Sequence, residues 1–251
     1  MLSLVKQLFL ISLGITIGGL VNYLADQLPS RKNFSYPLCR HCCKTISPIR
    51  WISLMNFVVG NCECDNKISL RPVLVELFFG VCLPLIDESI STNTHFVVSL
   101  LLLVCFSLII VIDIEHKLIL NSVIVPTACV ALLYGMQTNN QNLFIILASG
   151  IAGYLIMLMI FFGGKLYWKL FLKHKGLPDD LVVFGMGDVR LGGLIGLATG
   201  WSELPQTMVV SFIGIGIVAI AIKSNSSYKP FTMLPVGPFL IVGALIVLFF
   251  I

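Results

Sequence analysis

The chain has 251 residues, of which 57% are hydrophobic and only 11% are charged. This balance is far from that of a soluble globular domain, and it excludes such a domain as the main body of the chain. The formal net charge of +4 is small, so the total says little by itself. The positions of the 16 Lys and Arg residues along the chain are more informative. Composition therefore predicts a polytopic membrane protein.

Apolar runs near the roughly 20 residues that a helix needs to cross hydrocarbon recur along the chain. The first run lacks a basic flank beyond Lys6 and a small-x-small cleavage site before Asp26, so we interpret it as a retained span rather than a signal peptide. We predict an all-α fold with about eight transmembrane helices, at 8–25, 69–86, 95–112, 122–137, 143–163, 189–202, 206–222 and 236–251.

The loops between these runs alternate in charge. Those at 87–94, 138–142 and 203–205 contain no Lys or Arg, whereas the other set, with the adjoining span ends, holds every basic residue except Lys6. Basic loops are retained in the cytoplasm. The pattern therefore predicts that the second set of loops is cytoplasmic and that the N-terminus is outside.

One cytoplasmic loop is long, and it divides the chain into a first helix (1–25), a Cys-rich domain (26–68) and a multi-span core (69–251). Disulfides are disfavoured in the reducing cytosol, so cysteines crowded there are more naturally metal ligands. A C-x-x-C pair and a C-x-C pair about twenty residues later resemble a structural zinc site, with free buried thiols as the alternative. The predicted zinc ligands are Cys39, Cys42, Cys62 and Cys64, with His41 or Cys43 as substitutes.

Glu76 lies one or two turns into the second run. A carboxyl within a membrane span is costly, so it is a functional candidate by default, and we predict that it takes part in substrate approach. The alternative is a structural group, either protonated or paired with Arg71.

Two further acids define the candidate catalytic site. Asp113 closes the third run and Asp188 opens the sixth, so the predicted topology places both at the cytoplasmic membrane face. Gly185 and Gly187 leave the backbone bare beside Asp188, which would let a substrate chain approach closely. By itself the Gly-x-Gly-Asp stretch is equally consistent with an Asp that caps the N-terminus of a helix.

Small residues follow Asp188 at a regular interval. Gly192, Gly196 and Gly200 are spaced four apart in an apolar segment, which aligns them on one helical face. Such a face lets membrane helices pack closely.

The remaining features favour a membrane enzyme without a nucleic-acid partner. Basic and aromatic residues interleave at 165–175, which suits an interfacial helix on anionic lipid better than a nucleic-acid surface. Acids in membrane helices also occur in transporters, but the chain shows no inverted repeat. A zinc-bearing scaffold without catalysis is a third interpretation, and substitution of either aspartate distinguishes it from an enzyme.

Several of these landmarks, in this order, resemble the type IV prepilin peptidase family of Gly-x-Gly-Asp aspartyl proteases. The similarity covers nearly the whole chain. The segments that carry it are 18–22 with 28–29, the cysteine loop, 68–76, 112–121, 185–188 and 235–239.

The resemblance implies a bifunctional enzyme of the bacterial inner membrane. Such an enzyme removes the leader peptide of prepilins or pseudopilins, and it then methylates the new N-terminus using S-adenosylmethionine. Asp113 and Asp188 match the two catalytic aspartates of the family. Two carboxyls that share one site do not both ionise readily, so one holds a proton while the other activates the attacking water. No nucleotide-type fingerprint in the sequence identifies where S-adenosylmethionine would bind.

Overall fold

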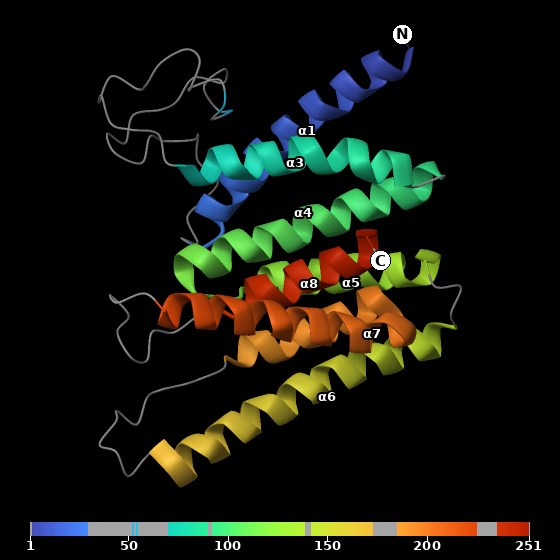
Figure 1. The fold of residues 1–251 in the computed structure, drawn as a ribbon. Helices are drawn as coiled ribbons and strands as arrows, with labels where there is room; N and C mark the ends of the chain where they lie inside the picture. Colours follow the sequence, from blue (N-terminus) through green and yellow to red (C-terminus); the bar gives the residue numbers. More distant parts are fainter. Residues whose placement is uncertain are drawn as a thin grey trace, which may run out of the picture. The chain divides into compact units, whose positions relative to one another are not determined.

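The computed structural model describes residues 2–29, 52, 54, 70–89, 92–138, 142–172, 185–224 and 235–250. Within these ranges the chain is helical and contains no strand, which confirms the all-α prediction for the described part. The chain divides into two compact units, Met1–Leu100 and Leu101–Ile251. The helices are α1 (Leu2–Gln27), α3 (Leu70–Ser89), α4 (Asn93–His116), α5 (Asn121–Thr138), α6 (Leu143–Tyr167), the short π-helix η2 (Trp168–Leu172), α7 (Met186–Lys223) and α8 (Gly237–Phe250), as shown in Figure 1.

Each of the eight predicted apolar runs falls largely within one of these helices. Among the described helices, four are long and apolar enough to cross a membrane, namely Leu4–Gln27, Asn93–His116, Leu143–Leu170 and Met186–Lys223. Large apolar side chains also point outward, among them Phe144 at 85% and Met159 at 72% exposure. Such surfaces suit hydrocarbon, so the chain is a multi-pass membrane protein, while the number of eight crossings stays a prediction.

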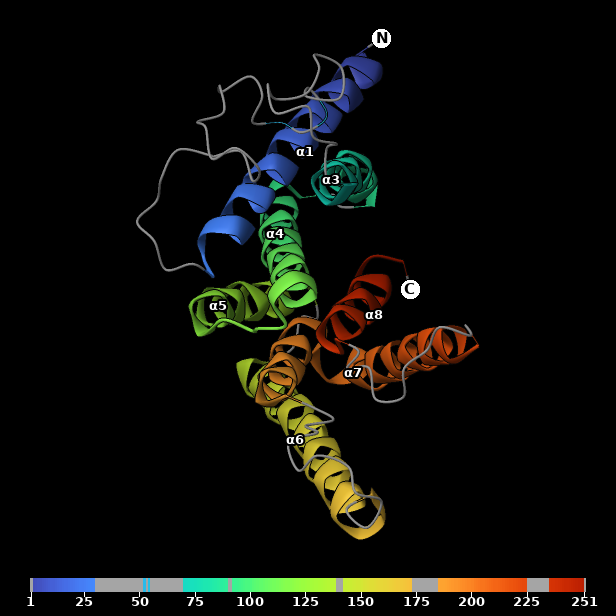
Figure 2. The ribbon, with the colours of Figure 1, turned by 90° about the vertical axis from the view of Figure 1, so that its left-hand side faces the viewer.

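Helix α7 is broken near its middle. Gly200 has φ 67° and ψ −174°, a region of backbone space that is open essentially to glycine alone. Figure 1 shows the α7 ribbon turning back on itself, and Figure 2 shows its first arm beside α6 and its second arm beside α8. The two apolar runs predicted at 189–202 and 206–222 are therefore the two arms of α7.

In the first unit, α1 and α3 pack closely and run antiparallel. A Cβ on Gly18 would lie 2.6 Å from the Cα of Glu76, so glycine is needed where the two backbones meet. At one end of the pair, Lys6 forms an ion pair of 2.7 Å with Asp87.

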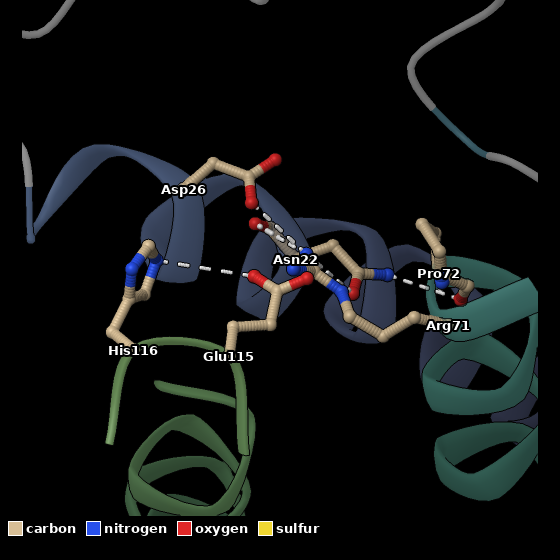
Figure 3. A network of polar contacts seen from close by, with 6 residues as sticks. All are labelled: Asn22, Asp26, Arg71, Pro72, Glu115 and His116. Atoms are coloured by element: carbon tan, nitrogen blue, oxygen red, sulfur yellow. Dashed lines mark hydrogen bonds and ion pairs between the residues drawn. The ribbon is translucent and has the colours of Figure 1, made fainter. Parts of the chain in front are cut away.

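The other end of the α1–α3 pair carries a second polar cluster (Figure 3). Arg71 forms an ion pair of 3.0 Å with Asp26. The side-chain amide of Asn22 donates a hydrogen bond of 3.0 Å to the carbonyl of Pro72. Polar contacts at both ends thus fix the register of the two helices.

In the second unit, α6 and the first arm of α7 meet through small residues. A Cβ on Gly153 would collide with the backbone carbonyl of Gly192, and a Cβ on Gly196 would collide with the carbonyl of Ser149. The predicted glycine face is thus confirmed for Gly192 and Gly196. Gly200, the third member of the predicted face, forms the break instead.

This interface gives a prediction with an internal control. Gly153→Ala places a methyl group against rigid backbone, so we expect the protein to lose about 1–3 kcal/mol of stability, as overpacked cores do. Gly163 lies in the same helix, and a methyl group added there would have no described atom of another residue within 4 Å, so Gly163→Ala should leave the unfolding midpoint unchanged or slightly higher. Thermal unfolding of both variants in detergent measures the difference, and equal midpoints would contradict the close α6–α7 packing.

Candidate active site

The structure brings the two predicted aspartates together within the second unit. Asp113 lies in the last turn of α4, and Asp188 is the third residue of α7. Both side chains are buried, at 6% and 9% exposure, and their carboxyls are near enough for the two charges to interact. In Figure 1 the C-terminal end of α4 and the N-terminal ends of α7 and α8 lie at the same end of this unit.

Asp188 is held by the first turn of its own helix. Gly185 is the N-cap of α7, and its backbone N–H donates a hydrogen bond of 3.1 Å to Oδ2 of Asp188. The Asp188 N–H in turn donates to the Gly185 carbonyl at 3.1 Å. Asp188 is therefore the acidic partner in a capping box rather than the N-cap itself. This arrangement fixes the side chain, and the helix dipole favours a negative charge there.

Asp113 lies where α4 ends. The backbone N–H of Lys117 donates a hydrogen bond of 2.9 Å to the Asp113 carbonyl, and Lys117 adopts φ 51°, so the chain leaves the helix through a left-handed residue. The Oδ2 atom of Asp113 is buried and has no hydrogen-bond partner among the described residues. It faces Gly237, the first residue of α8, on which a Cβ would lie 2.6 Å from that oxygen.

The segment that joins α4 to α5, residues 117–120, lies against the start of α7. A Cβ on Gly187 would lie 2.8 Å from the Cβ of Ile119, so the bare face of this glycine is covered by the linker. The guanidinium of Arg190 donates a hydrogen bond to the side-chain oxygen of Asn121. That Gly185 and Gly187 admit a substrate backbone stays a prediction, while the close approach recorded at Gly187 is made by this chain.

Glu76 belongs to the first unit, on α3. Its side chain is fully buried, and its Oε2 accepts a hydrogen bond of 2.8 Å from the backbone N–H of Leu54. Residue 54 lies in the stretch that we predicted to be the cysteine-rich domain. The structure therefore shows this acid binding the backbone of that segment, and its predicted part in substrate approach is untested.

The predicted zinc ligands lie outside the described residues. These are Cys39, Cys42, Cys62 and Cys64. Elsewhere, in the ranges that the structure describes, no group of three or more His, Cys, Asp or Glu side chains is arranged to hold a metal ion. The described thiols of Cys82, Cys105 and Cys129 are free; the first two are partly buried, whereas Cys129 is exposed and is not a core packing residue.

Comparison with known proteins identifies the chain. Residues 100–220 match the model of the type IV leader peptidase family, and residues 12–87 match that of the bacterial peptidase A24 N-terminal domain. Several curated relatives bear the name prepilin leader peptidase/N-methyltransferase. The protein of Aeromonas hydrophila is 27% identical over 89% of this chain and 74% of its own length. The protein of Legionella pneumophila is 27% identical over 84% of this chain and 71% of its own length. The protein of Klebsiella pneumoniae is 24% identical over 81% of this chain and 89% of its own length.

No solved structure matches the chain. The two family models together cover most of it, and they include both aspartates and the α1–α3 pair. The chain therefore belongs to the type IV leader peptidase family.

Proposed function

We propose that this protein removes the leader peptide of prepilin-like substrates at the cytoplasmic face of the bacterial inner membrane. The observation that carries the proposal is the placement of Asp113 and Asp188, two buried carboxyls on separate helices that interact through their charges. The names of the relatives supply the substrate class.

The arrangement suits general acid–base hydrolysis. Two carboxyls that share one buried site hold one proton between them, so one acts as a base and the other as an acid. The ionised carboxyl takes a proton from water, which attacks the peptide carbonyl, and the protonated carboxyl stabilises the oxyanion and protonates the leaving amine. The pair titrates as a unit, so either aspartate fits either part.

A second activity, N-methylation of the new N-terminus, follows from the relatives' names. Methyl transfer of this kind takes S-adenosylmethionine as the methyl donor. We also propose that zinc bound at Cys39, Cys42, Cys62 and Cys64 stabilises the cysteine-rich domain, because a segment of this size has too little core to fold alone. Metal analysis of the purified protein tests the zinc proposal separately.

The topology is a proposal with its own support. The loops that hold the basic residues follow α1, α4, α6 and the second arm of α7, and these are the loops that the charge rule assigns to the cytoplasm. Both aspartates lie beside these loops. A substrate leader that carries basic residues and remains cytoplasmic would thus meet the carboxyl pair where the helices end.

The test is incubation of membranes that contain the protein with a candidate prepilin, S-adenosylmethionine and zinc. Mass spectrometry of the product reads both activities from one N-terminus. We expect loss of the leader and a mass increase of one methyl group. An intact leader with every pilin and pseudopilin substrate tested would contradict the proposed function, whereas cleavage without methylation would remove only the second activity.

A further inference from the structure

The linker between α4 and α5, together with the first residue of α5, contacts the N-terminal end of α7 at two points. Ile119 lies on the bare face of Gly187, and Asn121 accepts a hydrogen bond from Arg190. These two positions of α7 stand on either side of Asp188 in the sequence. The same linker begins directly after the last turn of α4. Its first residue, Lys117, is held to that turn by the hydrogen bond from its backbone N–H to the Asp113 carbonyl.

The contacts therefore form a continuous path between the two acids. The linker is short, and its first residue is fixed to the turn that carries Asp113. Its far end is fixed at Asn121, where Val123 and Ile124 donate to the Leu120 carbonyl and begin α5. A linker fixed at both ends and pressed against α7 holds the end of α4 at a set distance from the start of α7.

Arg190 acts on this path rather than on Asp188 itself. Residues two apart on a helix do not face each other, so its guanidinium is not an intrahelical neighbour of the Asp188 carboxyl. The hydrogen bond to Asn121 has a charged donor, which makes it stronger than a bond between neutral groups. The long side chain reaches across to another element and leaves the carboxyl pair to the substrate.

We propose that Arg190 is a positioning residue, which with Asn121 clasps the α4–α5 linker to α7 and so sets the separation of Asp113 and Asp188. This inference rests on the proposed function for its kinetic consequence, but the clasp itself is a structural claim. Substrate binding does not require the clasp, whereas alignment of the two carboxyls on the attacking water does require it.

The experiment compares Arg190→Gln, Asn121→Ala and the double variant in the purified full-length protein. We expect each single change to lower kcat about tenfold with KM within about twofold, because a small displacement of catalytic groups impairs the chemical step. The double variant should be no slower than the slower single variant, because both changes break one bond. Asn121→Asp keeps an acceptor oxygen and should retain most of the kcat.

Lys223→Gln is the matched control, because it removes the same charge from the other end of α7, where Lys223 is exposed. It should leave both kinetic constants unchanged. Additive losses in the double variant would overturn the clasp. A rise in KM for Arg190→Gln with no effect of Asn121→Ala would do so as well, and would make Arg190 a substrate-binding residue.

Hydrogen exchange supplies a readout that needs no activity. Peptides that cover residues 117–124 should exchange faster in Arg190→Gln and in Asn121→Ala than in the wild-type protein or in Lys223→Gln. If the wild-type protein cleaves no prepilin, the proposed function fails while the exchange rates still decide the clasp. Unchanged exchange in both variants would overturn the clasp even if cleavage is confirmed.

Discussion

Asp113→Asn and Asp188→Asn should each abolish leader cleavage, with kcat lowered by at least about 100-fold, while the protein still inserts and folds. The amide keeps the shape of the side chain but can neither accept the proton of the attacking water nor hold the proton that the leaving amine needs. General acid–base catalysis by a placed side chain contributes about 10²–10⁴-fold. Neither partner can replace the other, because the scheme requires one of each protonation state.

The measurement is single-turnover cleavage of a purified prepilin, with the amount of folded enzyme matched by its unfolding curve. Glu203→Gln is the control, since Glu203 is a partly buried acid in the second arm of the same helix as Asp188. That variant should cleave within about twofold of wild type. If either aspartate variant keeps a tenth or more of the wild-type rate, that residue does not belong to the catalytic pair.

Much of the helical framework could be predicted from hydrophobicity alone. The apolar runs identify the helices because a membrane leaves backbone polar groups no other partners. The helix ends were less predictable. Helix α1 begins at Leu2, before the predicted start at residue 8, and α4 continues one turn beyond Asp113 to His116. Hydrogen bonding continues past the apolar stretch, whereas a composition window ends with it.

The break in α7 shows a limit of sequence reasoning. The stretch at 203–205, which contains no Lys or Arg, predicted a loop, yet these residues are helical and the chain reverses at Gly200. Pro205 lies about one turn into the second arm, where a missing N–H costs less than in the middle of a helix. The four-residue spacing of Gly200 from Gly196 predicted a place on the packing face. Only its φ of 67° shows that Gly200 forms the break in the helix.

The site itself was predictable only in its charged members. An acid at each span end, with a common topology, predicted that Asp113 and Asp188 converge. Ile119 and Arg190 gave no such signal, because their contacts are made between segments about 70 residues apart. Gly237 had a weak signal as part of a Pro- and Gly-containing start of the last apolar run, but its contact with Asp113 needed the structure.

The contact between Gly237 and Asp113 leads to the second large effect. Gly237→Ala would place a methyl group 2.6 Å from Oδ2 of Asp113 and 3.5 Å from a methyl carbon of Leu191. The carboxyl end is the most mobile of these groups, so we expect it to move while the helices stay in place. A displacement of about 1 Å in a catalytic group lowers the rate about 100-fold. Gly237→Ala should therefore lose most of its kcat with little loss of stability.

Gly243→Ala provides the opposite control in the same helix. Its new methyl group would collide with Ser211 on the second arm of α7, away from both aspartates. Ser211 is buried, and its hydroxyl lies 2.7 Å from the Thr207 carbonyl and 3.3 Å from the Leu240 carbonyl, to which its single proton can be donated, so this change should lower the unfolding midpoint. The folded fraction should still cleave at close to the wild-type rate.

Measuring kcat and the unfolding midpoint for both variants therefore separates damage to the carboxyl pair from damage to helix packing. If Gly237→Ala instead behaves like Gly243→Ala, with a lower midpoint and a normal kcat, then Oδ2 of Asp113 does not need its place beside α8, and the catalytic geometry is set by α4 and α7 alone.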